Sequence, residues 1–228
     1  MLLLHFMRQR AAAADLARDN AATSKTACRY LHEALDVMAG QAAELPEVVA
    51  AALNGGTEHL LQDGTRIDTD RIHDTTANGG SRHDRWCSGR RCHHGGLAQV
   101  VTDADGRPLW VSPVEPGRTH DQTAVRIHVL PLLHVAAGHG VPTLADKACI
   151  GTGAGIRVPV RRLRGAQLLE RSTRGWNSCV NSARAFVEHG VAHLETRWRT
   201  LARISSCPWR ISAIAATALA LSRLENRC

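Results

Sequence analysis

The sequence contains no apolar run long enough to cross a membrane and no recognisable secretory leader. Residues 1–6 are apolar but too few for the hydrophobic part of a signal peptide, and residues 211–221 have a length that suits a buried helix. The membrane-spanning class is therefore excluded. The cysteines, at positions 28, 87, 92, 149, 179, 207 and 228, are odd in number and irregularly spaced, which argues against a disulfide framework. We expect reduced thiols and a cytoplasmic location.

Lysine is scarce, although the formal net charge of the chain is +7. Only Lys25 and Lys147 are lysines, and a GC-rich genome accounts for this preference for arginine. It does not account for clustering: residues 157–210 hold eleven arginines and three glutamates, with no lysine or aspartate. Arginine makes planar, bidentate contacts with phosphate. The charge pattern therefore predicts a nucleic acid or another anionic surface as partner.

The N-terminal part, residues 1–53, is predicted to be a helical segment. Residues 11–18 favour one helix, and Thr23 or Ser24 can cap a second. Two helices joined by a short polar turn are typical of a helix-turn-helix that binds DNA. An ordinary helical hairpin is the alternative from the pattern alone.

Residues 54–228 are predicted to form one α/β domain, and the 44% hydrophobic content of the chain is enough to build its core. Strands are expected at 60–65, 97–102, 109–114, 141–145 and in two short pieces near 157–160, and helices at 120–133, 177–201 and 211–224. The Asp-rich turn at 103–107 predicts a hairpin, which makes the sheet mixed.

Three acidic residues stand where a phosphodiester-cleaving site can be built. Asp63 and Asp146 are expected at the ends of two strands, and Glu188 in the long helix. Three converging carboxylates can hold two divalent metal ions about 3.5–4 Å apart. Each acid also has an ordinary explanation, because Asp63-Gly64 is a common turn and Glu188 suits a solvated helix face.

These acids stand in motifs that resemble those of DDE superfamily transposases and endonucleases of bacterial insertion sequences, in particular the Harbinger-like group. The motifs occur here in the family's order: Asp63-Gly64-Thr65, Pro116-Gly117-Arg118-Thr119-His120-Asp121, Ala145-Asp146-Lys147 and Val187-Glu188. The resemblance covers roughly residues 60–222. Four motifs in order are far more specific than any one of them.

The resemblance implies an RNase H-like mixed sheet flanked by helices and a metal-dependent transposase that cleaves and joins DNA strands. It implies Asp63, Asp146 and Glu188 as catalytic and metal-binding residues, with Mg²⁺ or Mn²⁺ as the cofactor. His120 and Asp121 are expected to support the site, because the second carboxylate of this fold follows the fourth strand. Double-stranded DNA is the expected partner, with the bacterial nucleoid as the location when DNA is bound, and a homodimer is left open.

DNA contacts are expected from Arg90, Arg91, Arg197 and Arg199. The first two lie in a basic loop beside Cys87, Cys92, His93 and His94, a cluster whose spacing also allows a zinc site. Adjacent histidines rarely both reach one tetrahedral metal, so the phosphate-binding loop is the preferred interpretation.

Three positions depart from the family's pattern. Ala148 and Cys149 replace the Gly and Tyr that usually follow the Asp-Lys motif, and Glu195 replaces a Lys. Ala148 is expected to disfavour a positive φ in the turn that aims Asp146, and Glu195 to repel DNA. The sequence also begins abruptly, which suggests lost upstream sequence. We therefore expect a weak or inactive, truncated copy, and the alternative function is a non-catalytic DNA-binding remnant.

Overall fold

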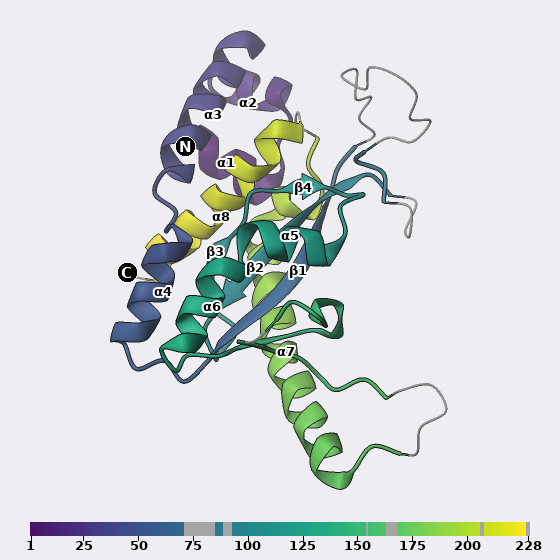
Figure 1. Cartoon of the computed structure of the whole chain (residues 1–228). Helices are drawn as coiled ribbons and strands as arrows, with labels where there is room; N and C mark the ends of the chain where they lie inside the picture. Colours follow the sequence, from purple (N-terminus) through teal and green to yellow (C-terminus); the bar gives the residue numbers. More distant parts are fainter. Residues whose placement is uncertain (71–84, 89–92, 154, 163–167, 206–207, 227–228) are drawn as a thin grey trace.

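A mixed β-sheet lies at the centre of the molecule (Figure 1). The structure is a computed structural model that describes the chain except residues 71–84, 89–92, 154, 163–167, 206–207 and 227–228. The strands are β1 (Leu60–Asp68), β2 (Gly95–Thr102), β3 (Pro108–Val111), β4 (Glu115–Pro116), β5 (Thr143–Ala145) and β6 (Ile156–Arg157). Their order is β3-β2-β1-β5-β6, with β4 beside β2.

The strand directions give the sheet its mixed character. β1, β2 and β3 pair antiparallel, whereas β5 runs parallel to β1 and β6 parallel to β5. Helices cover the sheet (Figure 1). This arrangement confirms the predicted α/β class with a mixed sheet flanked by helices. Two short strands were predicted near 157–160, but only β6 forms in the part of this region that the structure describes.

The strand end predicted at Asp63 is wrong, and the Asp63-Gly64 turn that was its ordinary alternative does not form either. Both residues lie inside β1, which pairs with β2 without interruption from Leu61 to Asp68. Gly64 does not have the positive φ of a turn glycine. A short polar sequence was mistaken for a strand end because its ladder partner, β2, is distant in the sequence.

The N-terminal segment consists of α1 (Leu2–Gln9), α2 (Ala13–Asp19), α3 (Ser24–Ala39) and α4 (Leu45–Asn54). Thr23 caps α3, as predicted, by accepting a hydrogen bond from the Thr26 N–H at 3.2 Å. The predicted helix pair corresponds to α2 and α3. Its role as a DNA-binding helix-turn-helix stays a prediction.

The remaining helices are α5 (Asp121–His128), α6 (Leu130–Gly138), α7 (Arg171–Arg197) and α8 (Ile211–Glu225), with 3-10 turns η1 (Lys147–Cys149), η2 (Arg199–Ala202) and η3 (Pro208–Arg210). The single helix predicted at 120–133 is therefore two, and the break falls just before Pro131, which lacks an N–H. Among the described residues, no helix is both long and apolar enough to span a membrane.

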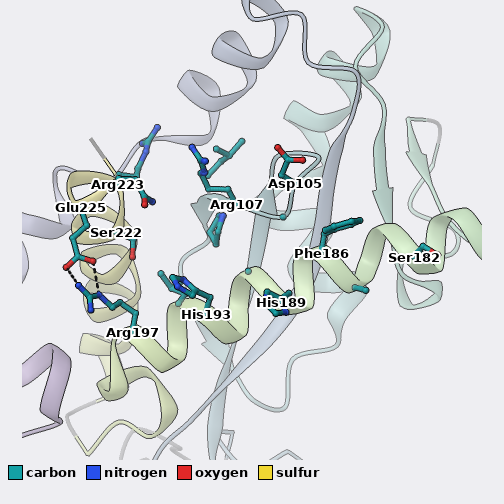
Figure 2. A pocket seen from close by; sticks show the side chains of 17 residues that line it. Asp105, Arg107, Ser182, Phe186, His189, His193, Arg197, Ser222, Arg223 and Glu225 are labelled. Atoms are coloured by element: carbon teal, nitrogen blue, oxygen red, sulfur yellow. Dashed lines mark hydrogen bonds and ion pairs between the residues drawn. The ribbon is translucent and has the colours of Figure 1, made fainter. Parts of the chain in front are cut away.

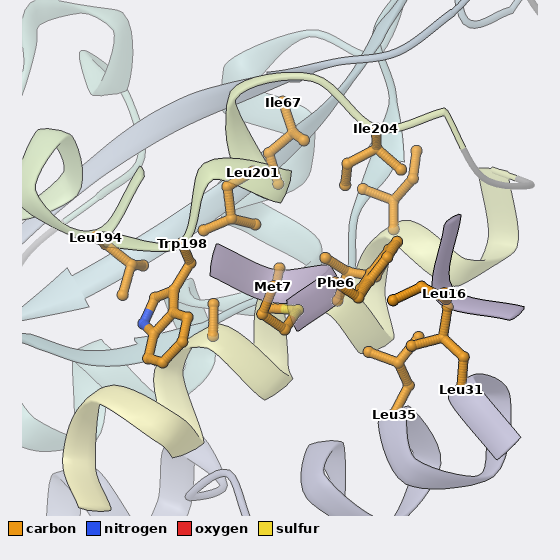
Figure 3. Close-up of a cluster of buried hydrophobic side chains, with 14 of the residues drawn as sticks. Phe6, Met7, Leu16, Leu31, Leu35, Ile67, Leu194, Trp198, Leu201 and Ile204 are labelled. Atoms are coloured by element: carbon orange, nitrogen blue, oxygen red, sulfur yellow. The ribbon is translucent and has the colours of Figure 1, made fainter. Parts of the chain in front are cut away.

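One hydrophobic core joins the N-terminal helices to the sheet (Figure 3). Trp198 at the end of α7 is fully buried, and its indole N–H donates to Ser222 Oγ of α8 at 2.6 Å. The same cluster contains Phe6, Met7, Leu16, Leu31, Leu35, Ile67, Leu194, Leu201 and Ile204. Helices α1–α3 thus bury their apolar faces in the same core as the sheet, and a separate DNA-binding role for residues 1–53 stays a prediction.

A second core lies on the other face of the sheet. It contains Leu60 of β1, Val125 of α5 and Leu133 of α6, and α4 packs on it through Val48 and Val49. Successive strand residues point to opposite faces, so β1 contributes Leu60 to this core and Ile67 to the first. β2 is buried along its whole length because helices cover both of its faces.

The β2–β3 turn touches α7 backbone to backbone. Asp103 Oδ1 holds the turn by accepting from the N–H groups of Asp105 and Arg107. Gly106 has a φ of 82°, and a Cβ on Gly190 of α7 would lie 1.9 Å from the Gly106 carbonyl oxygen. Both glycines are therefore required for this close approach.

Gly190→Ala is expected to lower the free energy of unfolding by about 2 kcal/mol or more, because the new methyl group forces α7 away from the turn. The matched control is Gly175→Ala on the same helix, where a Cβ would meet nothing within 4 Å. That change is expected to stabilise by about 0.5–1 kcal/mol. Urea unfolding checks both, and equal effects of the two variants would contradict the close contact.

Candidate functional site

Asp63 projects from β1 toward α7. Along β1 the alternate residues Asp63, Thr65 and Ile67 share one face. Ile67 packs in the core that contains Leu194 of α7, and the Thr65 hydroxyl donates to Glu195 of α7 at 3.5 Å. The strand thus fixes the Asp63 carboxylate, whose Oδ1 accepts from the Gly64 N–H at 3.0 Å.

Asp146 follows β5 directly and lies beside Asp63. The parallel pairing of β5 with β1 places Ala145 opposite Gln62, so the next residue of each strand reaches the same edge. Asp146 caps η1 by accepting a hydrogen bond from the Lys147 N–H. The strand-end position predicted for Asp146 is confirmed.

The turn that carries Asp146 is anchored on β1 through a buried polar chain. Cys149 Sγ donates to Gln62 Oε1 at 3.3 Å, and Gln62 Nε2 donates to Gln99 Oε1 at 2.6 Å. Burial raises the pKa of Cys149 to about 12, so this cysteine stays a neutral thiol and can donate. The residue that seemed a departure from the family pattern therefore holds the turn in place.

Ala148 does not have a positive φ, so the penalty predicted for it is wrong. It lies exposed in the middle of η1, a right-handed turn that alanine adopts without strain. The turn after β5 reaches its geometry through η1, and a glycine is not required at this position.

Glu188 lies on α7 and contacts the site through Arg184, one turn earlier. Arg184 Nη2 is 3.1 Å from Glu188 Oε1 and 3.4 Å from Asp146 Oδ2. One guanidinium therefore links a strand-end acid to a helix acid. Sequence reasoning missed Arg184, although its i,i+4 spacing from Glu188 marks an ion pair on one helix face.

The pKa of Asp63 responds to the charges of both other acids. Burial raises the pKa of Asp63 from the ordinary 3.8 to about 6; the Arg184 guanidinium and the Gly64 N–H lower it, while the carboxylates of Asp146 and Glu188 raise it. Asp63 thus senses both other acids and the arginine between them. Three carboxylates and one cation share this edge of the sheet.

The sequence of residues 62–223 matches the family model described as DDE superfamily endonuclease. The chain belongs to this family. No curated protein matches the chain significantly. Two solved structures are similar to it, a pre-cleavage Mos1 transpososome and a Mos1 transposase paired-end complex with left transposon end.

The Mos1 similarity is broad in extent but weak. Identities are 12% and 10%, the matches cover 99% and 98% of this chain and 77% and 75% of the Mos1 chains, and the TM-scores are 0.27 and 0.25. At such scores the backbones superpose poorly, so family membership is established by the sequence match alone.

The donor set of this DDE superfamily endonuclease suits a hard divalent cation, which prefers carboxylate oxygens. Asp63, Asp146 and Glu188 come from three elements, and mutual repulsion contributes to the raised pKa of Asp63; a bound cation relieves that repulsion. As the side chains stand, no three Asp, Glu, His or Cys residues in the described part of the chain are arranged to hold one ion. The chemistry of the residues fits a metal, while Arg184 separates two of them.

His120 and Asp121, expected to support the site, begin α5 on the other face of β1. His120 caps the helix through Nδ1, which accepts from the Gln122 N–H at 3.4 Å. A Cβ on Gly64 would lie 3.6 Å from Asp121 Oδ1, and Gly64 alternates with Asp63 in direction. Asp121 therefore lies near β1 but approaches it from the α5 side, and its supporting role stays a prediction.

Glu195 lies against β1 and is only partly exposed to solvent. Its carboxylate accepts from Thr65, and burial raises its pKa, with a smaller contribution from Asp68. A carboxylate turned toward the strand presents less charge to DNA than the solvent-facing acid expected from the sequence. Its effect on DNA approach stays a prediction.

The four arginines predicted to contact DNA differ in their surroundings. Arg90 and Arg91 lie outside the described residues, as does Cys92 of the candidate zinc cluster. Arg197 makes a two-bond pair with Glu225, with distances of 2.9 and 2.7 Å. Arg199 is exposed and has no ion pair with a described residue.

Arg197 also lies away from the three acids. Figure 2 shows it beside Glu225 at one end of a groove of about 990 Å³ between α7, α8 and the 103–107 turn. Phe186, His189 and His193 line this groove, on the opposite flank of α7 from Arg184 and Glu188. A DNA contact by Arg197 therefore needs its pair with Glu225 to open.

Asp63→Asn is expected to stabilise the metal-free protein at neutral pH. The folded-state pKa of about 6 exceeds the ordinary 3.8, so ionisation of Asp63 destabilises the fold fully above pH 6 and not at all below about pH 4. The gain at pH 7.5 is expected to be about 2–3 kcal/mol, from 1.36 kcal/mol per pKa unit. Urea unfolding with chelator between pH 4 and 8 checks this. If Asp63→Asn raises the free energy of unfolding equally at pH 4 and pH 8, the pKa of Asp63 is not shifted by the fold.

Proposed function

We propose that this chain is a DNA transposase that cleaves and joins phosphodiester bonds with Mg²⁺ or Mn²⁺ held by Asp63, Asp146 and Glu188. The observation that carries the proposal comes from a DDE superfamily endonuclease in which Asp146, after β5, and Glu188 of α7 both pair with Arg184. The charge of the same guanidinium also lowers the pKa of Asp63 of β1. Metal ions at such a site activate the attacking water or hydroxyl and stabilise the leaving oxygen.

The residues of the chain contribute position and charge. Asp63 is held by the strand ladder and Asp146 by its η1 turn, so both carboxylates come from rigid elements. Their separation is set by the β1–β5 pairing. In the metal-free protein Asp63 has a pKa of about 6, so below that pH a binding metal ion has to displace a proton from this ligand.

A surface for the DNA backbone is proposed next to these acids. Of the eleven arginines between 157 and 210, four are ion-paired: Arg184, Arg197, Arg203 and Arg210. Six others are exposed and form no ion pair with a described residue: Arg199 near the end of α7, and Arg157, Arg161, Arg162, Arg171 and Arg174 around its start. The last five form a surface of their own. We call these five the arginine arm.

The arginine arm has a defined support. Asn177 of α7 accepts from the Val160 N–H at 2.7 Å and donates to the Val160 carbonyl oxygen at 3.0 Å. This fixes the segment after β6 to the N-terminal half of α7, which projects beyond the sheet (Figure 1). A protruding, uncompensated basic surface fits a phosphate backbone.

Finer assignments belong to the same proposal. From the motifs we infer that the chain is encoded by a bacterial insertion sequence of the Harbinger-like group. We also infer that α2 and α3 recognise the element's ends and that double-stranded DNA is both substrate and target. A homodimer is left open. The second candidate is a non-catalytic DNA-binding remnant; Glu195 favours it through its position on the Glu188 flank of α7, whereas the strain expected at Ala148 no longer does.

Strand cleavage on duplex DNA taken from the flanks of the reading frame tests the catalytic proposal. Asp63→Asn, Asp146→Asn and Glu188→Gln are each expected to lower Mg²⁺-dependent cleavage by about a hundredfold or more, because each removes a charged ligand. Glu170→Gln, at the exposed start of α7, is the matched control and is expected to cleave like the unaltered chain.

The outcomes separate the two candidate functions. Cleavage that survives Asp146→Asn would refute the assigned site. If the unaltered chain binds the same DNA but does not cleave it, the result favours the second candidate, a non-catalytic DNA-binding remnant.

DNA binding at several salt concentrations tests the arginine arm. Arg161→Gln/Arg162→Gln is expected to reduce the magnitude of the log–log salt slope by about 2, since each phosphate contact contributes about 0.9. The control with the same charge change is Arg203→Gln/Arg210→Gln, whose side chains already pair with Asp70 and Asp36. Equal salt slopes in the two double variants would show that DNA binding depends on the net charge of the chain and not on the arginine arm.

A further inference from the structure

Arg184 occupies the space between acids that a metal is expected to bridge. Its Nη2 is within 3.4 Å of a carboxylate oxygen of Asp146 and 3.1 Å of one of Glu188. The side chain is 24% exposed, so this pair of contacts is partly shielded from solvent. A monovalent cation therefore already neutralises part of the acid cluster.

The arginine is not fully satisfied in this position. Its Nε is buried and has no hydrogen-bond partner among the described residues. Guanidinium groups at permanent structural sites usually satisfy their buried N–H groups. The contacts that hold the guanidinium are thus those to the two acids, and both are longer than optimal charge-assisted hydrogen bonds.

Charge explains why some cation is needed at this place. Asp63, Asp146 and Glu188 bring up to three negative charges to one sheet edge, and among the described residues Arg184 is the cation that pairs with two of them. A divalent ion would compensate the remaining charge, but it would use the carboxylate oxygens that Arg184 now contacts. A guanidinium and a divalent ion on the same oxygens, Asp146 Oδ2 and Glu188 Oε1, would lie next to each other, and their positive charges repel, so the two cations compete.

We propose that Arg184 is the resident counter-ion of this site: it holds Asp146 and Glu188 in place while metal is absent and must release both when a divalent metal binds. Arginine and metal then compete, and the side chain sets how much metal is needed to load the site. The inference rests on the proposed function, since it takes these carboxylates as the metal ligands. Arg184 acts here as a positioning residue.

Mn²⁺ binding to the full chain without DNA tests the competition, measured by titration calorimetry and by the electron paramagnetic resonance signal of free Mn²⁺. Arg184→Gln is expected to bind Mn²⁺ about tenfold more tightly than the unaltered chain, because two partly exposed ion pairs no longer have to be broken. Arg126→Gln, an exposed arginine of α5 with no assigned role in binding, removes one charge outside the site and is expected to change the Kd by less than about twofold.

A second measurement guards against a variant that folds poorly. Arg184→Lys keeps a cation but offers a single ammonium in place of the planar guanidinium. Its Kd for Mn²⁺ is expected to lie between those of Arg184→Gln and the unaltered chain. Without metal, Arg184→Gln is expected to have a lower Tm than the unaltered chain, and saturating Mn²⁺ is expected to raise its Tm by the larger amount.

The possible results distinguish this inference from the proposed function. If Asp146→Asn abolishes Mn²⁺ binding but Arg184→Gln binds as the unaltered chain does, or more weakly, the counter-ion role is wrong and the metal site stands. If Mn²⁺ binding is absent, or is insensitive to Asp146→Asn, both proposals fail.

Discussion

The parallel pairing of β5 with β1 decides where two of the three acids lie. Gln62 pairs with Ala145, so Asp63 and Asp146 follow at the same level on neighbouring strands. Short parallel strands need helices on both faces to bury them, and the two hydrophobic cores supply that cover. The position of the carboxylates therefore depends on packing far from them, including the fully buried Trp198.

The acid cluster is held at an electrostatic cost that the fold has to offset. Asp63 is raised to a pKa of about 6 mainly by burial, which means that its charge is disfavoured where it lies. Arg184 relieves part of this cost, and the polar chain through Cys149, Gln62 and Gln99 fixes the turn beside it. Shifted pKa values caused by buried charge are common where a ligand or ion is bound.

Family motifs and local signals predicted much of the fold and located the acids. Thr23 as a helix cap, the hairpin at 103–107 and Asp146 at a strand end depend on nearby residues, and all three are found. The strand end predicted at Asp63 was wrong because the length of β1 is set by its pairing with β2, which is distant in the sequence. Ala148 was misjudged because its backbone follows η1.

The sequence by itself determined the identity and order of the acids, the excess of arginine and the periodicity of the long helices, because these are properties of neighbouring residues. Only the tertiary structure decided which charges meet. Arg184 lies between acids of two elements, Arg197 pairs with Glu225 of α8, and Glu195 turns toward β1. Electrostatic contacts depend on distances between segments, and the packing of α7 across the sheet sets those distances.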